Sequence, residues 1–166
     1  MIFVTVGSMM PFDRLIEAMD QWAAEHKEAE VFAQIGEGAY WPRHMQWART
    51  ITPAGFCDRV ANSDLVVAHA GMGSIIVAAE AGKPIVIMPR VPSARELTTD
   101  HQLHTARRLQ GHPGIYVATS EAELPSRIQR ALNEGPRGVS ALPASAPAAF
   151  VRRVRDFLLD RAIRQQ

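Results

Sequence analysis

Short apolar runs alternate along this chain with longer segments in which apolar and polar positions are mixed. The short runs are typical of parallel strands that are buried on both faces, and the longer segments suit helices. The pattern therefore predicts strands at 2–6, 31–35, 50–56, 65–68, 84–88 and 115–118, with helices at 11–26, 74–81, 99–110 and 121–133. This alternation predicts the α/β fold class, with a doubly wound parallel sheet.

The composition changes near the C-terminal end of the chain. Residues 135–149 are rich in Gly, Pro, Ser and Ala, which is typical of a linker. Residues 150–166 return to helical spacing, and the apolar positions of one face are Phe150, Val154, Phe157, Leu158 and Ala162. We expect one domain at 1–134, a linker at 135–149 and a C-terminal amphipathic helix at 150–166. That helix packs either on its own domain or on a partner.

Charge and cysteine content narrow the function classes. The 166 residues carry a formal net charge of +1, which argues against a general nucleic-acid binder. Cys57 is the single cysteine, which excludes an intramolecular disulfide and indicates a reducing, cytoplasmic location. No apolar run approaches the roughly 20 residues that span a bilayer, and residues 1–7 lack the basic start of a signal peptide.

Four segments follow predicted strands and so converge at one edge of the predicted sheet. They are 7–8, 36–38, 69–74 and the segment that begins at 89–90. Ligands of doubly wound folds bind outside the carboxyl ends of the strands. We therefore expect the functional site at this edge.

The segment 69–74 carries the clearest chemistry. His69 ends a strand, Gly71 and Gly73 permit a sharp turn and a close ligand approach, and a helix begins near Ser74. A helix start presents free N–H groups and a partial positive charge, which favours a phosphate. The dinucleotide fingerprint G-x-G-x-x-G does not match, because Ile76 stands at its third glycine, and no Walker A run occurs. A phosphate or diphosphate site and a purely structural turn remain as alternatives.

Several ordered motifs resemble the donor-binding domain of glycosyltransferase family 28. They are His-Ala-Gly-Met-Gly-Ser at 69–74, Gly-Lys-Pro-Ile-Val-Ile-Met-Pro-Arg at 82–90 and Asp-His-Gln at 100–102. The start of the chain, at 3–8 and 12–16, resembles the single-domain members, which include subunits of exopolysaccharide and dolichol-linked UDP-N-acetylglucosamine transferases. The resemblance covers roughly residues 1–109. It implies a Rossmann-like fold, the donor half of the GT-B architecture, and a nucleotide-sugar-binding domain at 1–134.

The resemblance also implies roles for individual residues. Ser74 and the amides near Gly73 hold the donor diphosphate, and His69, the catalytic residue, donates a hydrogen bond as charge develops on the leaving UDP. Gln102, with Asp100 or His101, binds sugar hydroxyls. The full set of donor-binding residues that we expect is Gly7, Ser8, Gly71, Gly73, Ser74, Glu80, Arg90, Asp100, His101 and Gln102. Simpler interpretations are a locally bonded His69, a solvated Arg90 and an Asp100 that only caps its helix. The UDP-sugar is then a substrate, and neither a cofactor nor a metal is expected.

One position departs from the family pattern. The family usually has a glutamate five residues before the glycine of G-x-P, where it holds the ribose hydroxyls, and this chain has Val77 there. Glu80 follows three residues later, on nearly the same helix face. Glu80 either takes over the ribose contact or is a solvated residue at the helix end.

The resemblance implies that this chain forms only the donor-binding half of a two-domain enzyme. An inverting transfer needs a general base close to the acceptor hydroxyl, and the donor motifs contain no convincing candidate. We therefore expect a UDP-sugar-dependent hexosyltransferase subunit that works with a membrane-associated, acceptor-binding subunit and a lipid-linked acceptor. Its location would be cytoplasmic, at the inner face of the membrane through that partner. Two other classes stay open, a nonenzymatic UDP-sugar-binding activator and a UDP-sugar epimerase-like enzyme.

Overall fold

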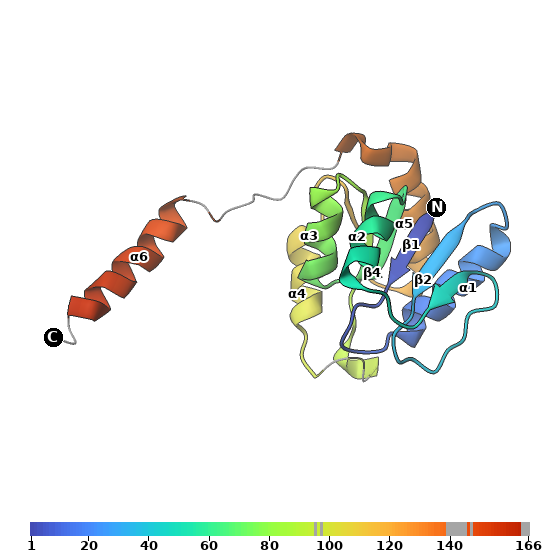
Figure 1. Ribbon diagram of the computed structural model, residues 1–166, viewed down its shortest axis with the longest axis horizontal. Helices are drawn as coiled ribbons and strands as arrows, with labels where there is room; N and C mark the ends of the chain where they lie inside the picture. The colour runs from blue at the N-terminus through green and yellow to red at the C-terminus, as the bar shows by residue number, and fades with distance from the viewer. Residues whose placement is uncertain (95, 97, 139–145, 147, 164–166) are drawn as a thin grey trace.

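A six-stranded parallel sheet forms the centre of the molecule (Figure 1). The structure is a computed structural model that describes residues 1–94, 96, 98–138, 146 and 148–163. The strands are β1 (Ile2–Thr5), β2 (Val31–Gln34), β3 (Gln46–Ala48), β4 (Leu65–His69), β5 (Ile85–Met88) and β6 (Ile115–Val117). Their order is β3-β2-β1-β4-β5-β6, and every neighbouring pair is parallel. This is the strand order of a Rossmann-type doubly wound sheet.

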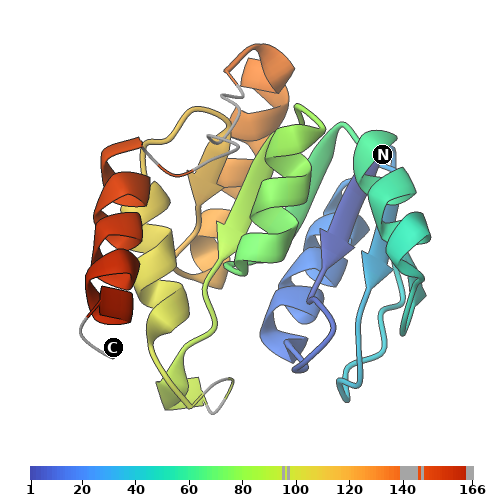
Figure 2. The same cartoon turned by 60° about the vertical axis from the view of Figure 1, so that its left-hand side comes forward.

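Helices cover both faces of the sheet. Helices α1 (Asp13–Glu25) and α5 (Leu124–Glu134) pack on one face, and α2 (Pro53–Ala61), α3 (Met72–Glu80) and α4 (His101–Leu109) pack on the other (Figure 2). Short 3-10 helices lie at Pro92–Ala94, Glu121–Glu123 and Gly135–Gly138. The fold class predicted from the alternating pattern is confirmed.

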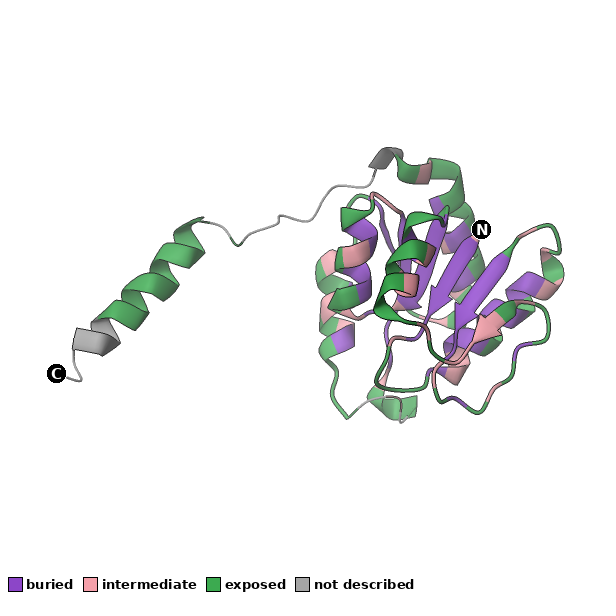
Figure 3. Ribbon diagram, viewed as in Figure 1, coloured by how far each residue is buried: buried purple, intermediate pink, exposed green. Residues whose placement is uncertain are grey.

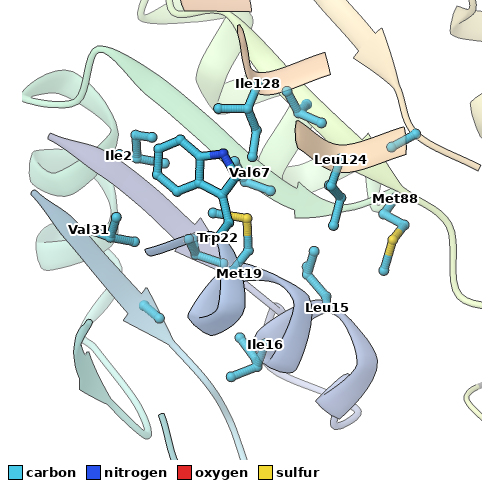
Figure 4. Close-up of a cluster of buried hydrophobic side chains, with 14 of the residues drawn as sticks. Ile2, Leu15, Ile16, Met19, Trp22, Val31, Val67, Met88, Leu124 and Ile128 are labelled. Carbon is cyan, nitrogen blue, oxygen red and sulfur yellow. The ribbon is translucent and has the colours of Figure 1, made fainter. Parts of the chain in front are cut away.

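The strands are apolar because both of their faces are covered. All four residues of β1, β2 and β5 are buried, and Figure 3 shows the buried strands beneath an exposed helical surface. Alternate residues of each strand enter two separate hydrophobic clusters, one on each face. Figure 4 shows the cluster between α1, α5 and the sheet, with the following side chains packed together: Ile2, Leu15, Met19, Trp22, Val67, Leu124 and Ile128.

The predicted strand at 50–56 is wrong. The chain forms the short edge strand β3 at Gln46–Ala48 and then begins α2 at Pro53. Thr52 is the N-cap of α2, and its side chain accepts a hydrogen bond from the backbone N–H of Gly55, with Pro53 at the first helical position. A threonine cap followed by proline is a strong helix start, and it outweighs the strand preference of the β-branched residues before it.

The C-terminal region is described in part. Residues 139–145, 147 and 164–166, which belong to the predicted linker and to the end of the predicted helix, lie outside the described residues. Helix α6 (Ala148–Ile163) agrees with the predicted C-terminal helix, and its residues 148–159 are all exposed (Figure 3). The division into domain, linker and helix stays a prediction. Within the described part of the chain, no helix has the length and hydrophobicity that crossing a membrane requires.

The sheet contains one position at which a crevice is expected. β1 lies between β2 and β4, so the connections that leave β1 and β4 run to opposite faces of the sheet, to α1 and to α3. Such a switch point opens a crevice beyond the carboxyl ends of the two strands. The loop after β1 and the turn after β4 form its two sides.

Candidate functional site

A cavity of about 660 Å³ occupies the switch point. It brings together five parts of the chain: the end of β1, the end of β2, the start of α2, the turn from β4 into α3, and the end of β5. The lining residues are Thr5, Val6, Gly7, Ser8, Met9, Met10, Pro11, Gln34, Gly36, Glu37, Thr50, Ile51, Thr52, Pro53, Phe56, Cys57, His69, Gly73, Ser74, Val77 and Arg90. The volume suits a small-molecule ligand.

His69 forms part of the cavity wall at the end of β4, and two glycines leave the space that its ring fills. A Cβ atom on Gly7 would lie 2.6 Å from Cε1 of the ring, and one on Gly71 would overlap Nε2. The backbone of Gly7 has φ +77°, a left-handed conformation that glycine adopts without strain. Both glycines are therefore needed for the observed place of the histidine.

His69 is held in its neutral form. Burial, followed by the positive charge of Arg90, lowers the pKa of His69 from 6.5 to about 4. Its Nδ1 atom is buried and has no hydrogen-bond partner among the described residues. A neutral imidazole carries one N–H donor and one acceptor nitrogen, so this ring can offer a ligand one nitrogen, as a donor or as an acceptor according to its tautomer.

The start of α3 presents free backbone donors to the same cavity. Gly71 is the N-cap, and the first helical residues are Met72, Gly73 and Ser74. Ser74 is only 6% exposed and lines the cavity. Gly73 also lines it, and a Cβ built on Gly73 would have no atom within 4 Å. Open space beside a helix N-terminus is the geometry that accepts an anion.

A buried amide fixes the loop opposite α3. Gln34, at the end of β2, accepts a hydrogen bond of 2.7 Å from the Thr5 hydroxyl, which in turn accepts one of 3.1 Å from the N–H of Gly7. The Nε2 group of Gln34 donates to the carbonyls of Gly7 and Arg49, at 3.1 Å each. Gln34 thus joins the loops that follow β1 and β3. Gln34 was not predictable from the sequence, because an isolated glutamine in a strand gives no motif.

Arg90 lies in the cavity wall, and Gln102 is hydrogen-bonded to it from outside the lining. Arg90 is 3% exposed, so the alternative of a solvated arginine at a strand end is wrong. The side-chain oxygen of Gln102 accepts a hydrogen bond of 3.0 Å from the backbone N–H of Arg90. Arg90 lines the cavity, and Gln102 supports it from α4 without being part of the lining.

Five of the expected donor-binding residues lie outside the cavity lining: Gly71, Glu80, Asp100, His101 and Gln102. Glu80 is the last residue of α3 and is exposed, whereas Val77, one turn earlier, forms part of the wall. Asp100 is the N-cap of α4 but makes no capping hydrogen bond, and its carboxylate instead pairs with Nε2 of His104 at 3.2 Å. His101 is also exposed. Their roles in donor binding stay predictions.

One wall of the cavity is apolar, and it was not predicted from the sequence. Ile51, Pro53 and Phe56 line this side from the start of α2, and Cys57 lies beside them. Ile51, Pro53 and Phe56 fall within 50–56, the segment that was predicted to be a strand, and a strand there indicates no ligand role. A flat aromatic ring can pack against such a wall. Among the residues that the structure describes, no group of three or more His, Cys, Asp or Glu side chains could hold a metal ion.

Comparison with protein families gives a match over almost the whole chain. Residues 1–157 match the family described as the glycosyltransferase family 28 C-terminal domain. A curated human protein, UDP-N-acetylglucosamine transferase subunit ALG13, is 31% identical over 128 residues, which are 71% of this chain and 11% of that protein. This chain therefore spans only a small part of the curated relative.

Solved structures of glycosyltransferases share the fold. The glycosyltransferase of kitacinnamycin has a TM-score of 0.59 and 19% identity, over 80% of this chain and 34% of that one. The calicheamicin glycosyltransferase CalG4 has a TM-score of 0.53 and 18% identity, over 97% of this chain and 44% of that one. Both are GT-B proteins, and at this level of identity the likeness shows the fold alone.

Proposed function

The chain belongs to the glycosyltransferase family 28 C-terminal domain family, and on that premise we propose that it is the donor-binding catalytic subunit of a two-chain hexosyltransferase. It binds a UDP-sugar in the cavity at the switch point, while a second chain binds a lipid-linked saccharide acceptor. The observation that carries this proposal is the arrangement at one end of the cavity. There the start of α3 and the neutral ring of His69 face the same space, and Gly73 leaves that space open.

The two ends of the cavity suit the two ends of a UDP-sugar. The apolar side chains of Ile51, Phe56 and Val77, which all line the cavity, bind the uracil ring. The start of α3 takes the diphosphate, because free N–H groups and the helix dipole both favour negative charge there. Ser74, the third residue of the helix, adds a hydroxyl donor on the cavity side.

His69 acts on the leaving group in this proposal. The bond between the anomeric carbon of the sugar and the β-phosphate oxygen breaks, and the acceptor oxygen bonds to that carbon. Negative charge then grows on UDP, which an oriented N–H donor from His69 and the amides of α3 stabilise. His69 has a pKa of about 4, so it is a weak base at pH 7 and is better suited to donate a hydrogen bond than to remove the acceptor proton.

The acceptor proton needs a base that this chain does not supply in the proposal. The cavity lining contains a single carboxylate, that of Glu37, among the described residues, and Arg49 pairs with it at 3.6 Å. The base and the acceptor site therefore come from the second chain. This division agrees with the curated relative, whose name describes it as a subunit of a UDP-N-acetylglucosamine transferase.

Helix α6 is the element that we assign to the second chain. Phe150 is 59% exposed, Val154 is 41% exposed and Leu158 is 60% exposed, and their spacing of four residues places them on one helix face. An apolar face of this kind is stabilised by packing against a partner. If the partner is membrane-associated, this subunit works at the cytoplasmic face of the membrane through it. Exopolysaccharide synthesis is the process that we propose for the pair.

A ligand panel tests the donor site. The amide NMR spectrum of the chain is recorded with UDP, several UDP-sugars, NAD and S-adenosylmethionine. We expect selective binding of UDP ligands, weakened at least fivefold by Ser74→Ala and by His69→Ala. Ser126→Ala, at an exposed serine of α5, is the matched control and should bind as the wild type does. Binding of NAD or S-adenosylmethionine without binding of UDP would refute the proposal.

A second experiment tests the division of labour between two chains. The chain is purified with a membrane-associated acceptor-binding subunit from the same organism, and sugar transfer to a lipid-linked acceptor is measured. The double substitution of Phe150 and Leu158 by serine should abolish association, whereas substitution of Arg152 and Arg153 by serine on the same helix should not. Association that survives the first double substitution removes α6 from the interface. Turnover of a UDP-sugar by the isolated chain without acceptor would favour the epimerase-like alternative.

A further inference from the structure

Arg90 is an almost fully buried cation whose described side-chain hydrogen bonds all go to backbone carbonyls, and its guanidinium lies over the ring of Phe12 at 5.0 Å. Arg90 lies just after β5 and is 3% exposed. Its Nε group donates to the carbonyl of Pro11 at 3.2 Å, and one terminal nitrogen donates to the carbonyls of Val6, at 2.7 Å, and Met10. All of these acceptors belong to the loop between β1 and α1, which forms one side of the donor cavity.

Gln34 and Thr5 hold the loop at Gly7, whereas the described hydrogen bonds of residues 8–11 all go to Arg90. Ser8, Met9 and Met10 are exposed, with Met9 88% exposed, so the loop has few buried side chains of its own to hold it. The carbonyls of Val6, Met10 and Pro11 converge on a single guanidinium. Hydrogen bonds from a charged donor are stronger than those between neutral groups, and the planar fork of arginine can reach several acceptors at fixed angles.

Arg90 is itself fixed from the opposite side. Its backbone N–H donates to the side chain of Gln102, which is 4% exposed on α4. A second set of hydrogen bonds also joins the segment after β5 to another element, α1. Arg14 of α1 binds both carboxylate oxygens of Glu96, at 2.7 and 2.9 Å, and the same carboxylate accepts from the N–H of Val91 at 2.8 Å. The segment after β5 is thereby joined to the loop after β1 and to α1.

We propose that Arg90 is a positioning residue of the donor site, which holds the loop of residues 7–11 in its binding shape and couples that loop to α4 through Gln102. This inference rests on the proposed function for its ligand, and it assigns Arg90 an action through the loop in place of a direct contact with the donor. The charge of Arg90 has a second effect, because it lies close enough to His69 to disfavour protonation of the imidazole.

The test compares Arg90→Met and Arg90→Lys with Arg59→Gln. Arg59, on α2, packs over the ring of Phe32 at 3.5 Å and is absent from the cavity lining, so it is a matched control. We expect Arg90→Met to weaken UDP binding at least tenfold and Arg90→Lys to have an intermediate effect. Arg59→Gln should stay within twofold of the wild type.

Two readouts need no nucleotide and distinguish positioning from general stability. In both Arg90 variants the methyl resonances of Met9 and Met10 should shift, because the loop carbonyls lose their common donor. The pKa of His69, followed by NMR, should rise in Arg90→Met and stay low in Arg90→Lys, which retains the charge. If the wild type does not bind UDP, the proposed function fails, and these two readouts still decide the role of Arg90.

The wild type supplies a measurement that is independent of folding of the variants. The Nε–H of Arg90 should exchange with water much more slowly than that of Arg107, which is exposed on α4. Equal exchange rates would overturn the proposal. It would also be overturned by a folded Arg90 variant that keeps the wild-type Met9 and Met10 resonances and binds UDP within twofold.

Discussion

At the scale of single residues, the cavity is shaped as much by glycines, which have no side chain, as by the side chains that line it. Gly7 and Gly71 leave the volume that the ring of His69 fills, whereas Gly73 leaves volume that nothing in the described structure fills. The same residue type thus has two roles within one turn. The sequence predicted the same role for Gly71 and Gly73, because a motif shows that a glycine is present but not which neighbouring side chain occupies the space beside it.

The two glycines of the turn should respond differently to alanine. Gly71→Ala places a methyl group on the His69 ring, so we expect a loss of about 1–3 kcal/mol in the free energy of unfolding. Gly73→Ala should fold as well as the wild type or slightly better, because alanine is favoured over glycine in a helix by up to about 1 kcal/mol. Its methyl group would enter the cavity, so UDP affinity should fall about tenfold. Urea unfolding and UDP titration measure both effects. Equal responses of the two variants would contradict this account of the turn.

The neutral state of His69 should make stability depend on pH. Its pKa is about 4 in the folded chain and about 6.5 when unfolded, so between these values the unfolded state binds more protons. Stability is then complete above pH 6.5 and is lost as the pH falls toward 4, by up to about 3 kcal/mol. Unfolding in urea at several pH values measures this, and His69→Gln should remove the loss in that window. An unchanged pH profile in His69→Gln would show that other groups cause it.

At the scale of elements, the start of α2 decides how one wall of the cavity is built. The β-branched residues Thr50, Ile51 and Thr52 favour a strand, but the cap at Thr52 and the proline after it begin a helix. The resulting helix turns Phe56 toward the cavity. The remaining predicted strands and the helices of the sheet domain overlap the observed ones, because apolar runs of four or five residues and longer periodic segments both carry a signal. The three-residue edge strand β3 is too short to give one.

The cap of α2 can be tested directly. Thr52→Ala removes the acceptor of the Gly55 N–H, so we expect a loss of about 1 kcal/mol in the free energy of unfolding. Thr50→Ala, at an exposed position two residues earlier, is the control and should change it by less than about 0.5 kcal/mol. Denaturant unfolding compares the two. A larger loss for Thr50→Ala would mean that the segment is stabilised as a strand.

At the scale of the whole molecule, the sheet topology explains why the site lies where it does. The order β3-β2-β1-β4-β5-β6 places the switch point between β1 and β4, and the sequence motifs at Gly7 and at 69–74 follow these two strands. That much was predictable, because both the alternation of elements and the glycine turn are local signals. The residues that hold the loops of the site in place were not predictable as such. Gln34 and Arg90 act through bonds to loops distant in the sequence, and such contacts have no local pattern.

The fold also sets what this chain can do alone. The described residues form a Rossmann-like domain with a crevice at its switch point, and the C-terminal helix exposes an apolar face. In the proposed enzyme, the donor is held by this domain and the acceptor by another chain. Donor binding is therefore the part of the reaction that the isolated chain should retain.

The central claim is that the start of α3 binds the diphosphate of a uridine nucleotide. The most direct measurement is the change in backbone amide shifts on addition of UDP to the ¹⁵N-labelled chain, with uridine as a control that lacks phosphate. We predict that the largest changes occur at Gly73, Ser74 and Ile75, that uridine does not produce them, and that Gly73→Ala diminishes them. Changes centred on another part of the chain, or equal changes with uridine, would contradict the account.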